Sequence, residues 1–445
     1  MSTRKLYAIA MIGAIALLGW QSTRGQVAKP KDDMMELYGL FVDAVEQVEE
    51  NYVRPVSRKE LLESALRGML SDLDPHSSYI NTSQWKDFRK TIEGRFGGIG
   101  ISVGMDQELR RLQVMTPMVG TPAYAAGVMA GDIILDIDGK STEGLDPENA
   151  VEVLQGRPGT EVKLTVLHET NGKTETLTMN RAIIEIPTVL GDSRKPNDTW
   201  DYMIDKDKKI GYIRISQFVQ NTTEEVKAAL TELTTEGMKG LILDLRDDPG
   251  GMLSSAVEIS DLFLEEGQIV STKGRSVPPR SYDAEKAGTF TGFPIAVLVN
   301  QNSASASEIV SAALQDQKRA IVVGQRSFGK GSVQNIIDLD DGNSVLKLTV
   351  ATYLRPSGKN IHRFKNAKET DEWGVKPNEG LEVKLTPDEY IKWAIGRRDR
   401  DLITAKGGKP KEKPDAKPKA EFRDKQLAKA LEAVTDQVGK VVPGE

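Results

Sequence analysis

The chain has 445 residues, of which 39% are apolar and 28% are charged, and its formal net charge is −6 at pH 7. This length is enough for two or three domains, and the negative charge argues against a dedicated nucleic-acid-binding protein, which usually carries a strong basic excess. The absence of cysteine excludes disulfides, thiolate nucleophiles and cysteine-ligated metals.

The first 28 residues have the pattern of an export segment. Arg4 and Lys5 precede an apolar run over residues 6–20, and polar residues follow. A short basic region before an apolar run of this length is typical of a secretory signal, whereas a full membrane span needs about 20 apolar residues. We therefore predict that residues 1–28 form an export signal or, if uncleaved, an N-terminal membrane anchor. A buried amphipathic helix is disfavoured, because no charge interrupts the run.

The next two regions differ in the period of their apolar residues. Residues 33–90 carry apolar side chains at three- and four-residue spacing, which predicts an N-terminal helical region. Residues 91–185 favour strands instead, with a helix over 147–154 and tight turns at Asp138-Gly139 and Asn171-Gly172. We predict a compact β-rich module in this second region.

Strands and helices alternate over residues 186–400. Such alternation favours an α/β core with parallel pairing, and sites in such cores tend to lie at the carboxyl ends of the strands. The strands are predicted at 213–218, 241–245, 295–299 and 321–323, and the helices at 224–233, 255–264 and 307–314.

The C-terminal part of the chain changes composition again. Residues 401–420 are rich in lysine and proline and nearly free of large apolar residues, which predicts a flexible linker. Residues 421–445 contain an amphipathic helix with Leu427, Ala430, Leu431 and Val434 on one face. Linker and helix suggest a role in assembly, as in a homo-oligomer, or in tethering. A solvated tail is the alternative.

Ser305 lies where a predicted strand meets a predicted helix, in the segment 300–308. A serine at such a junction can project its hydroxyl above the sheet, and the nearby helix N–H groups can stabilise an anion. The same serine, with Glu308 three residues later, also fits a capping box. This segment alone therefore leaves both a catalytic and a structural interpretation open.

Lys330 lies between two glycines just after a predicted strand. The segment 324–332 nearly matches a phosphate-binding loop, but Gly331 replaces the Mg²⁺-binding hydroxyl and a strand, not a helix, follows. Small neighbours let a lysine amine enter a poorly hydrated site, where desolvation lowers its pKa and makes it a base for a serine hydroxyl. A solvated loop lysine is the alternative. Gln334 could hydrogen-bond the amine and orient it.

A buried strand over 241–245 runs into the turn Pro249-Gly250-Gly251. Glycines at such a turn let backbone N–H groups approach a reacting carbonyl oxygen, as an oxyanion hole requires. Turns of this kind also occur for purely structural reasons, so the turn alone is weak evidence.

Taken together, these segments resemble the carboxyl-terminal processing peptidases, also called tail-specific proteases. The resemblance covers roughly residues 35–395 and the final helix. The matching motifs occur in the family's order, at residues 73–79, the β module from 97 onward, 243–246, 249–251, 303–309, 313–316 with 319–320, and 328–334.

This resemblance implies a multidomain protein of the α/β and α+β classes. An α/β peptidase core over 186–400, a crotonase-like spiral of strands and helices, would carry an inserted PDZ domain over 91–185 and the N-terminal helical region. The resemblance implies a serine endopeptidase with a catalytic dyad. Ser305 would be the nucleophile, Lys330 the general base and Gln334 the orienting residue, and the backbone N–H groups of Gly251 and Ala306 would donate to the oxyanion.

The family also implies how substrates are recognised. A protein or peptide with an apolar C-terminus would bind by β-strand addition near the PDZ strand formed by Gly98, Ile99, Gly100 and Ile101. With the export segment, this places the protein in the periplasm or on the outer face of the inner membrane of a bacterium, with an uncleaved signal as its membrane tether. Neither a metal nor a cofactor is expected.

The sequence departs from the family pattern at two places. Asp248 replaces the asparagine usual before Pro-Gly-Gly, which puts a carboxyl group close to the expected oxyanion site. The PDZ helix ends in Gln155-Gly156-Arg157, whereas many relatives carry arginine before the glycine, so a gating role for an arginine there does not carry over.

Three alternatives compete with a Ser-Lys peptidase. A Ser-His-Asp triad would need one of the three histidines, His76, His168 or His362, and none has an obvious relation to Ser305 in the sequence. The absence of an HExxH pattern disfavours a zinc peptidase. A non-catalytic periplasmic adaptor that binds protein tails through the PDZ domain is the alternative from a different class. The presence of Ser305, Lys330 and Gln334 together argues against it.

Overall fold

The computed structural model describes residues 34–403 and 422–440, and the chain divides into two compact units at Leu73 and Asp74. The predicted export segment over 1–28 and nearly all of the predicted linker over 401–420 lie outside the described residues. Within the described ranges, no helix is long and apolar enough to cross a bilayer.

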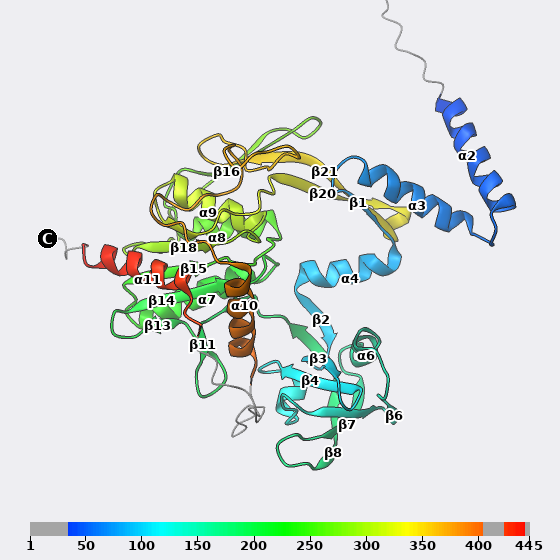
Figure 1. The fold of residues 1–445 in the computed structure, drawn as a ribbon, viewed down its shortest axis with the longest axis horizontal. Coiled ribbons are helices and arrows are strands. Elements are labelled where there is room, and N and C mark those ends of the chain that lie inside the picture. The colour runs from blue at the N-terminus through cyan, green and yellow to red at the C-terminus, as the bar shows by residue number, and fades with distance from the viewer. Residues whose placement is uncertain (1–33, 404–421, 441–445) are drawn as a thin grey trace, which may run out of the picture. The chain divides into compact units, whose positions relative to one another are not determined.

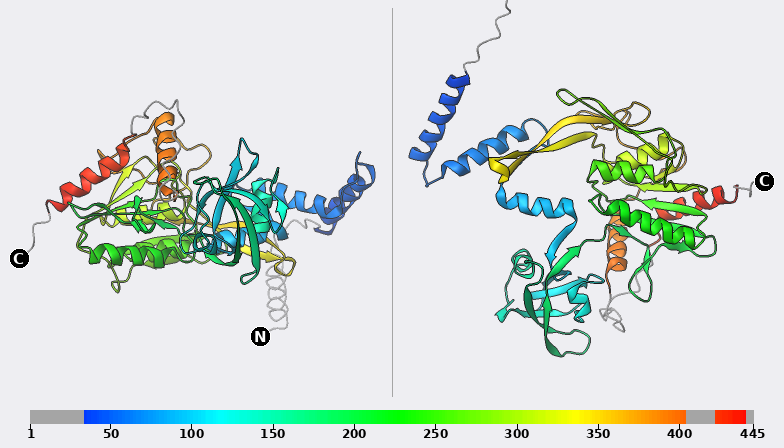
Figure 2. Two further views of the ribbon diagram at one scale, coloured as in Figure 1. Left: turned by 90° about the horizontal axis from the view of Figure 1, so that it is seen from below. Right: turned by 180° about the vertical axis from the view of Figure 1, so that it is seen from behind.

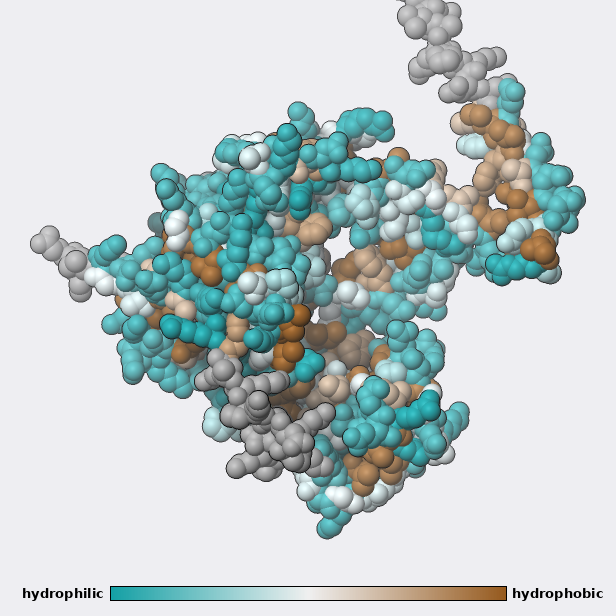
Figure 3. All heavy atoms as spheres, viewed as in Figure 1, coloured by the Kyte–Doolittle hydropathy of each residue, from teal (hydrophilic) through white to brown (hydrophobic). Residues whose placement is uncertain are grey.

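The first unit contains the helices α2 (Met34–Asn51) and α3 (Arg58–Ser71). Ser57 caps α3 through a capping box, in which Glu60 accepts the Ser57 N–H and the Ser57 hydroxyl accepts the Glu60 N–H. The helix α2 exposes apolar side chains, including Leu37, Leu40 and Phe41, and Figure 3 shows brown, hydrophobic surface on this helix. The predicted N-terminal helices are confirmed here.

The second unit begins with a strand that the sequence did not predict. β1 (Ser78–Ile80) pairs antiparallel with β21 (Ser344–Leu354) before α4 (Thr82–Glu93) begins. Its three residues are too few to show an alternating pattern, and a partner more than 250 residues away in the sequence defines it.

The predicted β-rich module forms a sheet around its own apolar core, drawn in cyan to green in Figure 1. The strand order is β3-β4-β5-β7-β8, with β6 beside β5, while β2 and β9 form a separate antiparallel pair. The elements are β2 (Arg95–Gly98), β3 (Ile101–Asp106), β4 (Arg111–Pro117), α5 (Pro122–Ala125), β5 (Ile133–Ile137), β6 (Lys140–Ser141), α6 (Pro147–Leu154), β7 (Glu161–Leu167), β8 (Thr174–Asn180) and β9 (Ala182–Glu185).

One expectation for this module is wrong. Residues 98–101 do not form a continuous strand, because the chain turns at Gly100, where φ is +80°. Gly98 ends β2 and Ile101 begins β3, and the buried Ile99 and Gly100 connect the two strands. An added Cβ at Gly100 would lie 2.4 Å from the Thr121 side chain, so only glycine fits this turn.

Residues 186–400 contain a sheet with the predicted parallel pairing. Its order is β10-β14-β15-β18-β19, with β13 beside β14, and the four strands from β14 to β19 are parallel neighbours. The strands are β10 (Val189–Leu190), β13 (Met203–Asp205), β14 (Ile210–Ile215), β15 (Gly240–Asp244), β18 (Ile295–Val299) and β19 (Ile321–Gly324), and a short ladder joins β11 (Ser193–Arg194) to β12 (Trp200–Asp201).

Helices cover both faces of this parallel sheet, since alternate side chains of each strand point to opposite faces. Leu241 and Leu243 lie in the core shared with α7 (Thr222–Thr235), α8 (Leu253–Asp261) and α9 (Ala306–Asp316). Ile242 lies in the core on the other face, with Ala430 and Val434 of α11 (Lys425–Val438). Figure 2 shows α7 and α11 on opposite sides of the sheet.

The C-terminal helix α11 is therefore part of the core and is not a solvated tail. Ala430 and Val434 are fully buried, and Gln426 donates to the Val383 carbonyl at 2.8 Å. Arg246, itself paired with Asp244, donates to Asp424 at the start of the helix. The apolar stripe predicted on this helix is confirmed, and it packs against the sheet of its own chain.

A second, antiparallel sheet has the order β1-β21-β16-β17, with β20 beside β21. Its further elements are β16 (Gln268–Gly274), β17 (Arg280–Asp283) and β20 (Ser332–Leu339), and the 3-10 turn η1 (Asp340–Gly342) joins β20 to β21. The helix α10 (Pro387–Asp401) follows later in the chain. Because β20 begins two residues after Lys330, this sheet connects the lysine segment to β1 through β21.

Candidate active site

Ser305 lies between β18 and α9 in a strained backbone conformation. Its φ and ψ are +58° and −112°, a region that side-chain-bearing residues rarely occupy and that is retained mainly at functional sites. The side chain is partly exposed, whereas Ala304 and Ala306 on either side are buried. A serine held on a sharp strand-to-helix turn presents its hydroxyl outward, as a nucleophile must.

The Pro-Gly-Gly turn packs directly against Ser305. A Cβ on Gly250 would lie 2.7 Å from the Ser305 Cβ and 2.5 Å from the Ala304 carbonyl oxygen, so no larger residue fits. The Asp248 carbonyl accepts the Ala304 N–H at 3.0 Å and the Ser307 hydroxyl at 3.0 Å. These bonds hold the turn against the serine loop.

The two proposed oxyanion donors are free at this junction. Gly251 and Ala306 donate their backbone N–H groups to no acceptor within the described ranges. Unpaired N–H groups near a nucleophile can bind a developing negative charge without first breaking another bond. Both groups are therefore available for the role that the family resemblance implies.

Glu308 joins the serine segment to the lysine segment. Its carboxylate is fully buried and accepts four hydrogen bonds, two on each oxygen. Oε1 accepts from the Ser327 hydroxyl at 2.6 Å and the Gly329 N–H at 2.7 Å, and Oε2 accepts from the backbone N–H groups of Ser305 at 2.9 Å and Lys330 at 2.8 Å. The sequence analysis recognised Glu308 only as a capping residue.

Lys330 lies in the loop between β19 and β20, partly buried. Burial lowers the pKa of Lys330, and the positive charge of Lys347 lowers it further, while Glu308 opposes both. The Tyr353 hydroxyl contacts the backbone carbonyls of both loops, that of Lys330 and that of Ser305, the latter at 3.2 Å. The structure therefore brings the serine and lysine loops together, although they are far apart in the sequence.

Gln334 lies in β20 with its amide nitrogen fixed. Nε2 donates to the Ser332 hydroxyl at 2.9 Å and to the Thr349 hydroxyl at 3.2 Å. Thr349 in turn donates to Asp74 at 3.2 Å. Although burial alone would raise it, hydrogen bonds from Ser77, His76 and Thr349 hold the pKa of Asp74 below its ordinary value. With Nε2 occupied in this way, the amide oxygen of Gln334 is left to accept a bond.

The three histidines do not form a triad with Ser305. No imidazole hydrogen-bonds this serine in the part of the chain that the structure describes. His168 pairs with Asp132 at 3.0 Å inside the β-rich module. His362 Nδ1 accepts the Gly331 N–H at 3.4 Å, and burial followed by the charge of Lys330 lowers the pKa of His76. Two histidines thus lie close to the lysine loop, a proximity that the sequence did not indicate.

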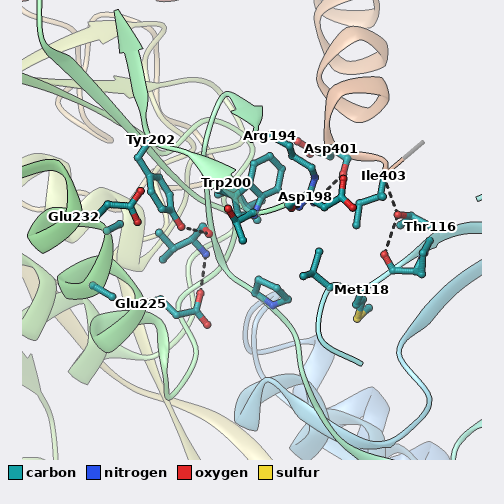
Figure 4. A pocket seen from close by; sticks show the side chains of 18 residues that line it. Thr116, Met118, Arg194, Asp198, Trp200, Tyr202, Glu225, Glu232, Asp401 and Ile403 are labelled. Carbon is teal, nitrogen blue, oxygen red and sulfur yellow. Dashed lines mark hydrogen bonds between the residues drawn. The ribbon is translucent and has the colours of Figure 1, made fainter. Parts of the chain in front are cut away.

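A separate cavity of about 580 Å³ is lined by none of these candidate residues. Figure 4 shows it, with Tyr202 and Trp200 among its walls. Two of its carboxylates are already paired: Glu225 accepts the Thr188 N–H at 2.8 Å, and Asp401 binds Arg214 at 2.6 Å. The free N–H groups and the partly buried lysine lie instead around the strained Ser305.

Comparisons with known proteins identify the family of the chain. Residues 209–379 match peptidase family S41, residues 113–167 match a PDZ domain, and residues 18–84 match the N-terminal domain of the activating protease CtpB.

Relatives match most of the chain. The carboxy-terminal-processing protease of Bartonella bacilliformis is 40% identical over 399 residues, which is 88% of this chain and 83% of that protein. The carboxy-terminal processing protease CtpA of Bacillus subtilis is 33% identical over 87% of this chain and 78% of its own length. Among solved structures, a photosystem II D1 C-terminal processing protease is 29% identical, with a TM-score of 0.41 over 77% of this chain and 92% of that one. The chain thus belongs to peptidase family S41, as a serine endopeptidase of the carboxyl-terminal processing kind with a PDZ domain.

Proposed function

We propose that the protein cleaves protein substrates with a Ser305-Lys330 dyad and selects them by an apolar C-terminus bound at the PDZ domain. One observation carries the dyad: the strained Ser305 and the partly buried Lys330 are held by the same carboxylate. The backbone N–H groups of both residues donate to Glu308. Lys330 has the lowered pKa that a neutral general base needs.

The proposed reaction follows from these groups. Neutral Lys330 takes the proton from the Ser305 hydroxyl, and Oγ attacks the scissile carbonyl carbon. The N–H groups of Gly251 and Ala306 stabilise the resulting oxyanion. Protonated Lys330 then gives its proton to the leaving amine, and a water molecule hydrolyses the acyl-enzyme with Lys330 again as base. Gln334 accepts a bond from the lysine amine and orients it.

The PDZ edge supports binding of a chain end. β3 is an edge strand of its sheet, so its outer side can pair with an added peptide strand. The carbonyls of Ile99 and Gly100 accept the N–H groups of Ala123 and Met118, whereas the N–H groups of Ile99 and Gly100 donate to no other described residue. Free N–H groups at the start of an edge strand suit the capture of a terminal carboxylate.

Tail selection is tested with two unstructured reporters that differ only at the C-terminus, one ending in apolar residues and one ending in aspartates. We expect faster cleavage of the apolar reporter, and Ser305→Ala serves as the inactive control. If wild type and Ser305→Ala both bind the apolar-tailed reporter and neither cleaves it, the adaptor alternative would be supported. Equal cleavage of the two reporters would contradict tail selection.

We also propose that the protein works in the cell envelope of a bacterium, on the outer side of the inner membrane. The basic and apolar pattern over residues 1–28 supports this location. Protease added to intact spheroplasts should digest the protein, whereas a cytoplasmic marker should survive. Survival of both would contradict an exported location.

A further inference from the structure

Asp248 is a buried carboxyl group that the proposed reaction does not use. Its side chain is fully buried directly before the Pro-Gly-Gly turn. One oxygen, Oδ1, accepts the Gly250 N–H at 2.8 Å, and the other, Oδ2, has no hydrogen-bond partner among the residues that the structure describes. An ionised carboxylate left with one unpaired oxygen in such a site is costly, whereas a neutral acid needs far less compensation.

The position of Asp248 connects it to both halves of the oxyanion site. Through Oδ1 it holds Gly250, whose carbonyl accepts the Phe218 N–H at 3.0 Å and whose neighbour Gly251 carries a free N–H group. Through its own carbonyl it holds Ala304 and Ser307, on either side of Ser305 and Ala306. A shift of Asp248 would therefore move both proposed oxyanion donors relative to the nucleophile.

The charged groups around Asp248 face other partners. Asp247 binds Asn300, Asn302 and Tyr390. Arg246 binds Asp244 and Asp424. On α9, Glu308 binds the serine and lysine loops, and the segment at Phe218 adds no charge. Burial raises the pKa of Asp248 well above its ordinary value, although the hydrogen bond from the Gly250 N–H opposes this shift.

We propose that Asp248 is the residue that positions the oxyanion turn, that it does so as a neutral carboxylic acid, and that its ionisation reduces activity at high pH. This inference rests on the proposed dyad. The proposed role requires that Asp248 keep its proton to a higher pH than Lys330 does, so that activity first rises with pH as Lys330 loses its proton. It falls again when Asp248 becomes an unpaired buried anion beside the site where the oxyanion forms, because two negative charges in a desolvated site repel each other.

The test is the pH dependence of kcat/KM for the apolar-tailed reporter, with the full chain. Wild type should show a rise and a reversible fall. Asp248→Asn keeps the acceptor for Gly250 but cannot ionise, so it should keep the rise and lose the fall. Asp248→Ala removes the acceptor and should lower kcat/KM roughly 10²-fold at pH values below the fall, as small misplacements of a reacting geometry do.

Asp247→Asn is the matched control, since the Asp247 carboxylate binds Asn300, Asn302 and Tyr390 and does not contact the Gly250 N–H, and it should keep the fall. If Asp248→Asn does not fold, Asp248→Ser, which also cannot ionise, replaces it. A fall that persists unchanged in the non-ionising variant, or a wild type without a fall, would overturn the inference. So would a folded Asp248→Asn that is inactive at every pH. Full activity of Ser305→Ala in the same assay would instead contradict the proposed dyad.

Discussion

Lys330→Ala is expected to lower kcat by about 10⁴-fold, to the same level as Ser305→Ala and the double variant. A nucleophile and its base act as one unit, so removing either should cost as much as removing both. The remaining rate would come from the oxyanion donors and substrate binding alone. The measurement is kcat for the apolar-tailed reporter at saturating substrate, together with the unfolding midpoint to show that each variant is folded.

The pH dependence of activity distinguishes a Lys330 that acts as general base from one that only supports the structure. Because the base must be neutral, activity should rise with pH toward the lowered pKa of Lys330, and Lys330→Ala should lose this rise. The positive charge of Lys347 helps to lower that pKa, so Lys347→Gln should move the rise to higher pH, and Lys347→Arg should leave it in place. Wild-type kcat in Lys330→Ala, or an unmoved rise in Lys347→Gln, would contradict the assignment.

The sequence predicted the residues whose chemistry is local. Ser305 stands at a strand-to-helix junction and Lys330 between two glycines, and both patterns are visible within ten residues. The alternation of strands and helices likewise predicted the parallel sheet, since each buried strand is a continuous apolar run. The stripe on α11 was also visible, but not its partner, because Ile242 and Ala296 lie far upstream in the chain.

The parts that the sequence could not predict depend on contacts between distant segments. In the sequence, Glu308 fits a helix cap, and its contact with the lysine loop appears only in the folded chain. Asp74 lies in the motif at residues 73–79, and its contact with Thr349 appears only where β1 pairs with β21. Residues 98–101 read as one apolar strand, although the turn at Gly100 divides it. The composition of an apolar run does not indicate which of its glycines adopts a left-handed conformation.

Glu308→Ala is expected to destabilise the second unit by roughly 3–5 kcal/mol and to abolish most activity, because it leaves four donors without their acceptor in a buried site. Burial raises the pKa of Glu308, and its hydrogen bonds oppose that shift. Since all four partners donate, the acceptor-only carboxylate is the form that satisfies them. Glu308→Gln keeps the shape but turns one acceptor oxygen into a donor group, so it should still lose about half of these bonds.

The glutamine variant makes the role of Glu308 measurable apart from folding. Where it remains folded, kcat should fall by roughly 10²-fold, because the Ser305 and Lys330 backbones are no longer held by one group, while KM for the reporter should change little. Glu60→Gln is the matched control, since Glu60 occupies the same capping position on α3 but is exposed, and it should shift stability by less than about 0.5 kcal/mol. Wild-type kcat and stability in Glu308→Gln would show that the two loops keep their places without this carboxylate. Loss of stability with unchanged kcat would assign Glu308 to folding alone. The expected joint loss would instead show that one buried side chain both stabilises the unit and sets the distance between nucleophile and base.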